Sequence, residues 1–157
     1  MSLYALTIRQ PWVNCIIYGD KRLENRTWPP PTAVVGSLLA LHAGSILDDD
    51  AVTTHFVYDA MQMPFWTEAE LVRSAILGVA RLVGVVETSD DRWFSGPYGW
   101  VLADVVPIAP MPCAGRQGVW EVPTAVLATV REHYHTAVQT RAAQTDQYIQ
   151  QKRFNDE

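Results

Sequence analysis

The first 28 residues constrain the fold most, because their hydrophobic pattern changes period within a short stretch. Residues 3–9 alternate and are rich in β-prone side chains, which predicts a strand that ends near Arg9. Pro11 then stands at a first helical position, and the apolar residues 12, 13, 16 and 17 form a helical stripe. Gly19 is expected to end this helix in a left-handed conformation. The segment therefore predicts a domain that mixes sheet and helix.

A charged segment follows, and its pattern is extended. On a strand over residues 22–28, one face carries Arg22, Glu24, Arg26 and Trp28. A carboxylate flanked by fixed cations can pair with them and orient their remaining donors towards phosphate or a base edge. The same spacing also fits a solvated strand face whose surface ion pair is worth about 0–1 kcal/mol. Charge spacing alone leaves both interpretations open.

Cations also stand at both ends of the short helix. The helix that begins at Pro11 presents backbone N–H groups beside Arg9, which suits a phosphate or a carbonyl oxygen. Lys21 lies just past the other end of the helix. These positions extend the predicted site from the charged strand to the helix.

The middle of the chain predicts more sheet, interrupted by an acidic helical excursion over about residues 46–76. Further strands are expected over 37–43, 77–88, 99–109 and 117–122. Gly78 and Gly84 indicate bends in the long strand. Helices are expected over 46–62 and 67–76.

The C-terminal part is expected to be a helix that begins at Thr124. Its apolar stripe fades beyond about Thr140, so the last ~15 residues are predicted to be a frayed arm, or to order against a partner. We expect two parts in the chain, a domain over 1–122 and a helical extension over 123–157.

Charge and composition limit the choice of partner. The 157 residues carry a net charge of −5, which argues against a broadly basic nucleic-acid binder. The acidity is concentrated in residues 45–70, whereas residues 1–28 hold four basic and two acidic side chains. A polyanion can therefore approach the N-terminal part. No apolar run approaches the ~20 residues of a membrane helix, no signal peptide is expected, and Cys15 and Cys113 form no disulfide framework, so the default location is cytoplasmic.

The motif Gly19-x-Lys21-x-x-Glu24-x-Arg26, preceded by Gln10-Pro11-Trp12, resembles the signature of the ASCH (activating signal cointegrator homology) family. Further segments resemble that family in the same order, over 36–43, 76–80, 93–100 and 115–121. The resemblance implies an α+β fold, namely a small PUA-like β-barrel flanked by helices. It also implies RNA or DNA contact in a cleft lined by the motif. We expect a single-stranded or modified nucleotide in preference to a duplex, because the cleft of a 157-residue barrel is small and the net charge is acidic.

Carried over to this chain, the resemblance places three charged side chains in the cleft, Lys21, Glu24 and Arg26. Along its edge it places Arg9, Gln10 and Trp12. Aromatic side chains near turns, including Trp28 and Trp93, suit stacking on bases, worth about 1–3 kcal/mol per base, although tryptophan also fills small cores. His42 ends a strand and is a further candidate for the cleft. No metal site and no cofactor are expected.

Two other functions stay open. Family members that hydrolyse 4-acetylcytidine use a threonine where this chain has Glu24, which counts against that amidohydrolase mechanism here. A ribonuclease is another possibility, with Lys21, Glu24 and His42 as acid, base and charge stabiliser. The last alternative is a protein-interaction domain that uses the acidic segment and the C-terminal helix, including self-association.

Overall fold

The computed structural model describes residues 2–52, 57, 59 and 66–156. A single six-stranded sheet runs in the order β2-β5-β4-β3-β1-β6. Its strands are β1 (Tyr4–Gln10), β2 (Leu23–Arg26), β3 (Leu38–Leu47), β4 (Ala75–Val86), β5 (Tyr98–Pro112) and β6 (Val119–Glu121). β1 and β3 are parallel, and every other neighbouring pair is antiparallel. The described helices are α1 (Trp12–Ile17), α2 (Asp49–Val52) and α4 (Thr124–Asp156), with 3-10 turns at Thr32–Val34 and Glu68–Glu70.

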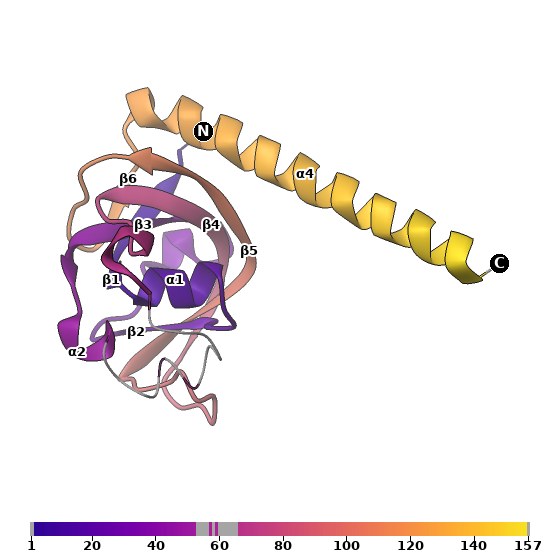
Figure 1. Ribbon diagram of the computed structural model, residues 1–157. Helices are drawn as coiled ribbons and strands as arrows, with labels where there is room; N and C mark the ends of the chain where they lie inside the picture. The colour runs from indigo at the N-terminus through magenta and orange to yellow at the C-terminus, as the bar shows by residue number, and fades with distance from the viewer. Residues whose placement is uncertain (1, 53–56, 58, 60–65, 157) are drawn as a thin grey trace.

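The sheet is strongly curved but does not close, so the expected barrel is wrong while the α+β class is confirmed. Figure 1 shows β4 and β5 bending around α1, with the short strands β2 and β6 at the two edges. β2 has four residues and pairs with β5, and β6 has three and pairs with β1, so neither edge strand pairs with the other. The Arg26 side chain on β2 instead reaches across to β1, where Nη2 donates to the Thr7 carbonyl oxygen at 2.7 Å.

Two of the three irregularities in the β4–β5 ladder come at the predicted glycines. The ladder shifts register between Ile76 and Gly78 and between Leu82 and Gly84, and also between Val79 and Arg81, where there is no glycine. A Cβ atom at Gly78 would lie 2.9 Å from the Ile17 side chain, so glycine lets α1 pack directly on the sheet. That packing places Val13, Ile16 and Ile17 of α1 in the main hydrophobic core.

The end of α1 differs from the expectation for Gly19. The helix ends at Ile17, its C-cap residue Tyr18 has φ −108° and ψ −9°, and Gly19 does not adopt a positive φ. The Arg22 side chain takes over the role of a C-cap, because Nη1 donates to the carbonyl oxygens of Ile16, Gly19 and Lys21 at 2.9–3.1 Å. Arg22 is therefore a structural residue in this fold.

The acidic excursion contains less helix than expected. β3 continues through Leu47, and α2 begins only after Asp48, whose side chain accepts from the N–H of Ala51 at 3.1 Å. Within the helix expected over 46–62, positions 53–56, 58 and 60–62 lie outside the described residues. The helix expected over 67–76 is wrong: Thr67 and Glu70 form a capping box around one 3-10 turn, and the apolar residues from Ala75 onwards join the sheet as β4.

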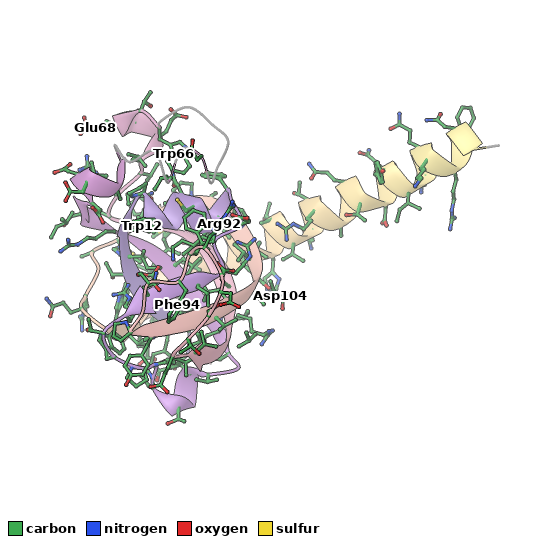
Figure 2. All side chains as sticks on the ribbon, turned by 90° about the horizontal axis from the view of Figure 1, so that it is seen from below. Trp12, Trp66, Glu68, Arg92, Phe94 and Asp104 are labelled. Atoms are coloured by element: carbon green, nitrogen blue, oxygen red, sulfur yellow. The ribbon has the colours of Figure 1, made fainter. Side chains whose placement is uncertain are left out.

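α4 is a single helix of 33 residues, so the frayed arm expected beyond Thr140 is wrong. Its first turns pack on the sheet through Val126, Leu127 and Val130. The second half of α4 extends away from the sheet in Figures 1 and 2. It is rich in Ala, Gln, Arg and Lys, whose intrinsic helix propensity is high even where a helix packs against nothing. None of the described helices combines the length and apolar character that a membrane crossing requires.

Candidate functional site

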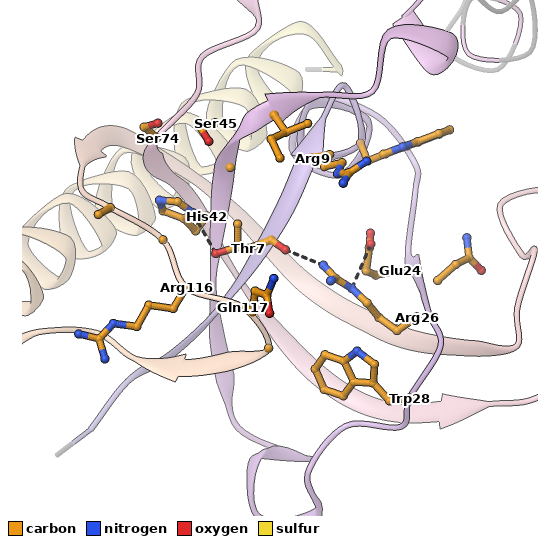
Figure 3. A pocket seen from close by; sticks show the side chains of 17 residues that line it. Thr7, Arg9, Glu24, Arg26, Trp28, His42, Ser45, Ser74, Arg116 and Gln117 are labelled. Carbon is orange, nitrogen blue, oxygen red and sulfur yellow. Dashed lines mark hydrogen bonds and ion pairs between the residues drawn. The ribbon is translucent and has the colours of Figure 1, made fainter.

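The main pocket lies where the curved sheet leaves β1 and β2 without a shared ladder. It has a volume of about 930 Å³ and is walled by β1, β2, β3 and the loop between β5 and β6 (Figure 3). The lining residues are Thr7, Arg9, Trp12, Glu24, Asn25, Arg26, Trp28, His42, Gly44, Ser45, Ile46, Ser74, Ala114, Gly115, Arg116, Gln117 and Gly118. Six of the sequence-predicted residues therefore meet here: Arg9, Trp12, Glu24, Arg26, Trp28 and His42.

Glu24 stands at the centre of a chain of charges on β2. Its Oε2 lies 3.3 Å from Nζ of Lys21, and its Oε1 lies 3.5 Å from Nε of Arg26. Lys21 also donates to the carbonyl oxygen of Leu23 and lies over the Trp12 ring at 5.9 Å. Lys21 and Glu24 are both buried, whereas the Arg26 side chain is 21% exposed. The pair therefore holds Arg26 from behind and leaves it facing the pocket.

Arg26 keeps donor capacity in this position. Nη2 is used by the Thr7 carbonyl, and the contact of Nε with Glu24 is an ion pair without hydrogen-bond geometry. Among the described residues, no acceptor takes a hydrogen bond from Nη1. Arg26 is thus a partly engaged guanidinium that is fixed in direction and able to bind an anionic or carbonyl oxygen.

The pocket is cationic although the chain is acidic. Three arginines, Arg9, Arg26 and Arg116, face one carboxylate, Glu24, among its lining residues. Arg9 and Arg116 are exposed and have no ion-pair partner in the described part of the chain. Figure 3 shows them on opposite sides of the pocket, with Thr7 between them. The opening is therefore flanked by unneutralised positive charge on both sides.

A chain of hydrogen bonds links Thr7, His42 and Trp120 at the floor of the main pocket. Nε2 of His42 lies 2.8 Å from the carbonyl oxygen of Cys113, and Nδ1 lies 3.2 Å from Oγ1 of Thr7. Because a carbonyl only accepts, the neutral imidazole must carry its proton on Nε2, and the Thr7 hydroxyl then donates to Nδ1. Nε1 of Trp120 donates to the same hydroxyl oxygen at 3.0 Å. Burial lowers the pKa of His42 below its ordinary value, and the bond to the Cys113 carbonyl opposes that shift.

His42 should make stability depend on pH. Its lowered pKa means that, as pH falls through the ordinary histidine value of about 6.5, the unfolded chain takes up the proton first. We expect the free energy of unfolding to reach its full value above that pH and to decrease below it. Urea unfolding at several pH values measures this slope, and His42→Asn should remove that part of it. Equal slopes in the two proteins would contradict the prediction.

Two of the predicted site residues, Gln10 and Trp93, do not line the main pocket. Gln10 is fully buried and caps α1, because Oε1 accepts from the N–H of Asn14 at 3.1 Å while Nε2 donates to Asn14 Oδ1 and to the Val72 carbonyl. This cap occupies the end of α1 where we expected N–H groups to receive a phosphate. Trp93 is buried against Cys15 and Leu23, and its Nε1 donates to Asp20 at 3.0 Å.

Lys21 and Trp93 line a second, smaller pocket of about 450 Å³ on the other side of Glu24. Trp12, Arg92 and Phe94 also line it, and these three residues are labelled in Figure 2. The structure thus separates Lys21 from the main pocket, where only Glu24 and Arg26 of the charged motif are presented. In the described part of the chain, no group of three or more His, Cys, Asp or Glu side chains is arranged to hold a metal ion.

Sequence reasoning missed the other lining residues of the main pocket, among them Thr7, Arg116 and Gln117. The signal for Thr7 was present, since Thr7 and Arg9 alternate with the buried Leu6 and Ile8 and so share the opposite face of β1. Arg116 and Gln117 lie in a loop far along the chain, and their place over β1 follows only from the pairing of β6 with β1.

Comparison with known proteins agrees with this architecture. The profile of the ASCH domain family matches residues 6–103. Solved structures of ASCH from Zymomonas mobilis are similar: the wild-type structure and one point mutant each have a TM-score of 0.51 and 13% identity, covering 83% of this chain and 94% of that chain. A second mutant has a TM-score of 0.50 and 13% identity, with coverages of 84% and 98%. At this identity the likeness concerns the fold. No curated protein sequence matches.

Proposed function

Since the chain belongs to the ASCH domain family, we propose that its main pocket binds a nucleotide of a single-stranded or modified nucleic acid. One observation supports this above all others: three arginines and a single carboxylate line the pocket of a chain whose net charge is −5. Arginine binds phosphate and base edges through its planar set of donors. An acidic protein with one cationic pocket is suited to an anion that enters that pocket.

The size of the pocket favours one nucleotide over a duplex. Pockets for small ligands span about 300–1,000 Å³, and this one measures about 930 Å³. Single strands can present an unstacked base to such a pocket, whereas a duplex cannot without flipping a base. Trp28 lines the pocket with its ring set edge-to-face on Trp100, with centroids 4.8 Å apart. An indole held in this way gives a base a firm aromatic neighbour.

The charged residues take separate roles in this proposal. Arg26 contacts the nucleotide, and Arg9 and Arg116 contact phosphates on either side of it. Glu24 holds the direction of Arg26, and Lys21 compensates the charge of Glu24 from the interior. Lys21 is thus a positioning residue, which differs from its expected place in the cleft.

Replacing the two rim arginines should weaken binding in a salt-dependent way. A charge-assisted hydrogen bond is worth about 1.5–3 kcal/mol, so Arg9→Ala and Arg116→Ala should each raise the Kd of a short RNA or single-stranded DNA about tenfold or more. Each lost phosphate contact should also reduce the slope of log K against log salt by about 0.7 between about 50 and 200 mM salt. Fluorescence anisotropy with labelled oligonucleotides measures both quantities.

The matched control is Arg153→Ala, which removes the same charge from the exposed end of α4. It should leave the Kd almost unchanged. An equal loss in this control would mean that net charge, not the pocket, governs binding. If the wild type binds neither RNA, single-stranded DNA nor nucleosides at low salt, the proposed function is wrong.

A further inference from the structure

We propose that Thr7 and His42 form a nucleophile–base pair that hydrolyses small anionic carboxylic esters in the main pocket. The proposal goes beyond nucleotide binding and does not depend on it. It rests on the hydrogen-bonded chain at the pocket floor, in which one hydroxyl, one imidazole and one backbone carbonyl are linked in sequence.

The geometry supplies the three parts that an activated hydroxyl needs. Oγ1 of Thr7 lies 3.2 Å from Nδ1 of His42, within reach of proton transfer. The carbonyl oxygen of Cys113 holds Nε2–H at 2.8 Å, so the lone pair of the imidazole faces the hydroxyl. Trp120 donates to Oγ1 at 3.0 Å, which favours the developing alkoxide and leaves one lone pair of the oxygen unused.

The environment makes Thr7 the reactive member of the pair. Thr7 is half-buried and lines the pocket, whereas His42 is only 1% exposed and acts through the hydroxyl beside it. The two other hydroxyl groups of the lining, on Ser45 and Ser74, have no base as hydrogen-bond partner in the described structure. Cys15 is no competitor, since it is buried and burial raises the pKa of its thiol to about 12.

The rest of the pocket indicates the class of ester. Arg9 and Arg116 flank Thr7 on opposite sides, so a substrate that carries a carboxylate or phosphate can be held with its ester above the hydroxyl (Figure 3). Arg116 and Gln117 both line the pocket, and their backbone N–H groups donate to no acceptor among the described residues. Gly115 packs closely on the pair, since a Cβ atom there would lie 2.5 Å from the His42 ring and 2.7 Å from Oγ1 of Thr7, and only glycine fits.

The reaction balances with water as the only co-reactant. Oγ1 of Thr7 attacks the ester carbonyl carbon, and its proton passes to Nδ1 of His42. The bond to the leaving oxygen breaks, that oxygen takes the proton, and the acyl group remains as an ester on Thr7. Water then attacks this ester and gives a proton to Nδ1, the bond between the acyl carbon and Oγ1 breaks, and Oγ1 regains the proton. One ester and one water become one acid and one alcohol.

The test uses the full chain with p-nitrophenyl acetate and mono-p-nitrophenyl succinate. The wild type should release p-nitrophenolate about tenfold or more faster than Thr7→Val or His42→Asn. It should prefer the succinate, and that preference should disappear in Arg9→Ala with Arg116→Ala. Peptide mass spectrometry of the acetate reaction should find the acetyl group on Thr7. Thr7→Ser should keep the activity, because it retains the hydroxyl and the bond to His42.

Controls separate this proposal from a merely structural network and from nucleotide binding. Thr27→Ala removes an exposed hydroxyl outside the pocket lining and should change nothing. Oligonucleotide binding by the wild type, measured alongside, reports on the proposed function alone, so failure of hydrolysis and failure of binding remain distinguishable. Release no faster than in buffer, equal release by wild type and Thr7→Val, or acetylation only at other residues would overturn the proposal. If Thr7→Val fails to fold, the rates of p-nitrophenolate release by Thr7→Ser and His42→Asn are compared instead. Equal rates in these two variants would overturn the proposal.

Discussion

Replacing Lys21 with methionine is expected to lower the free energy of unfolding by about 3–5 kcal/mol. Lys21 is 2% exposed, and its ammonium contacts both the carboxylate of Glu24 and the carbonyl of Leu23. Methionine fills much of the same volume but removes the charge. Glu24 would then be buried with only the longer contact to Arg26, at 3.5 Å, as a counter-ion. The cost comes mainly from this uncompensated carboxylate.

A double variant distinguishes that cause from lost packing. In Lys21→Met with Glu24→Gln both charges of the pair are removed, so urea unfolding should show recovery of a large part of the lost stability. The matched control is Lys152→Met on the exposed half of α4, which should change stability by no more than about 0.5 kcal/mol. A similarly small effect of Lys21→Met, or no recovery in the double variant, would contradict the prediction that the buried Lys21–Glu24 pair stabilises the fold.

The same variants separate stability from recognition. Glu24→Gln keeps the shape of the side chain but weakens its hold on Arg26, so it should loosen the guanidinium without removing it. Lys21→Met removes the charge that pairs with Glu24, so its effect on Arg26 is indirect. Both fit the structure, in which one charged motif serves two purposes: Lys21 and Glu24 lie inside the fold, and Arg26 is the part that the pocket presents.

Local patterns in the sequence predicted the elements near the pocket well. Alternation along β1 and the charged alternation in β2 were sufficient to place Glu24 and Arg26 on one strand face, because side-chain direction in a strand depends only on parity. The glycines at 78 and 84 likewise marked two of the three register shifts of the long ladder. Such features are decided within a few residues of the chain, which is why pattern reasoning reaches them.

Features decided by distant contacts were not predictable in this way. Whether β2 and β6 pair depends on the lengths and curvature of strands between them, so the open sheet could not be distinguished from a barrel. Lys21 is placed inside the fold by its neighbours around the second pocket, such as Trp12 of α1. Gln10 caps α1 through hydrogen bonds to Asn14 and to the Val72 carbonyl, which is distant in the sequence. A lysine or glutamine beside charged neighbours looks the same in sequence whether it faces ligand or core.

The open sheet is itself the reason that a pocket exists. Had β2 paired with a strand from the other edge, backbone hydrogen bonds would fill the space that Arg26 now spans to reach Thr7. The gap places Arg26 of one edge strand in the same pocket as the Thr7 hydroxyl of β1 and the His42 imidazole of β3. The proposed recognition of an anion and the proposed chemistry at Thr7 therefore both depend on the same interruption of the sheet.

Substitution of Gly115 with alanine tests how closely the β5–β6 loop fits this floor. A Cβ atom there would lie 2.5 Å from Cε1 and 2.7 Å from Nδ1 of His42, and 2.7 Å from Oγ1 of Thr7. Real Cβ atoms do not approach so closely, so either the loop or the imidazole must shift. We expect a loss of about 1–3 kcal/mol in the free energy of unfolding, as for other overpacked sites.

The shift should be visible at the imidazole itself, because the loop also supplies the carbonyl of Cys113 that holds Nε2. Nitrogen NMR of the His42 ring should show a changed tautomer balance in Gly115→Ala, together with weaker oligonucleotide binding and slower ester hydrolysis. Gly84→Ala is the control, since a Cβ at Gly84 meets nothing within 4 Å. Unchanged ring signals and equal stability in the two variants would mean that the loop moves aside without disturbing His42, which would contradict the prediction.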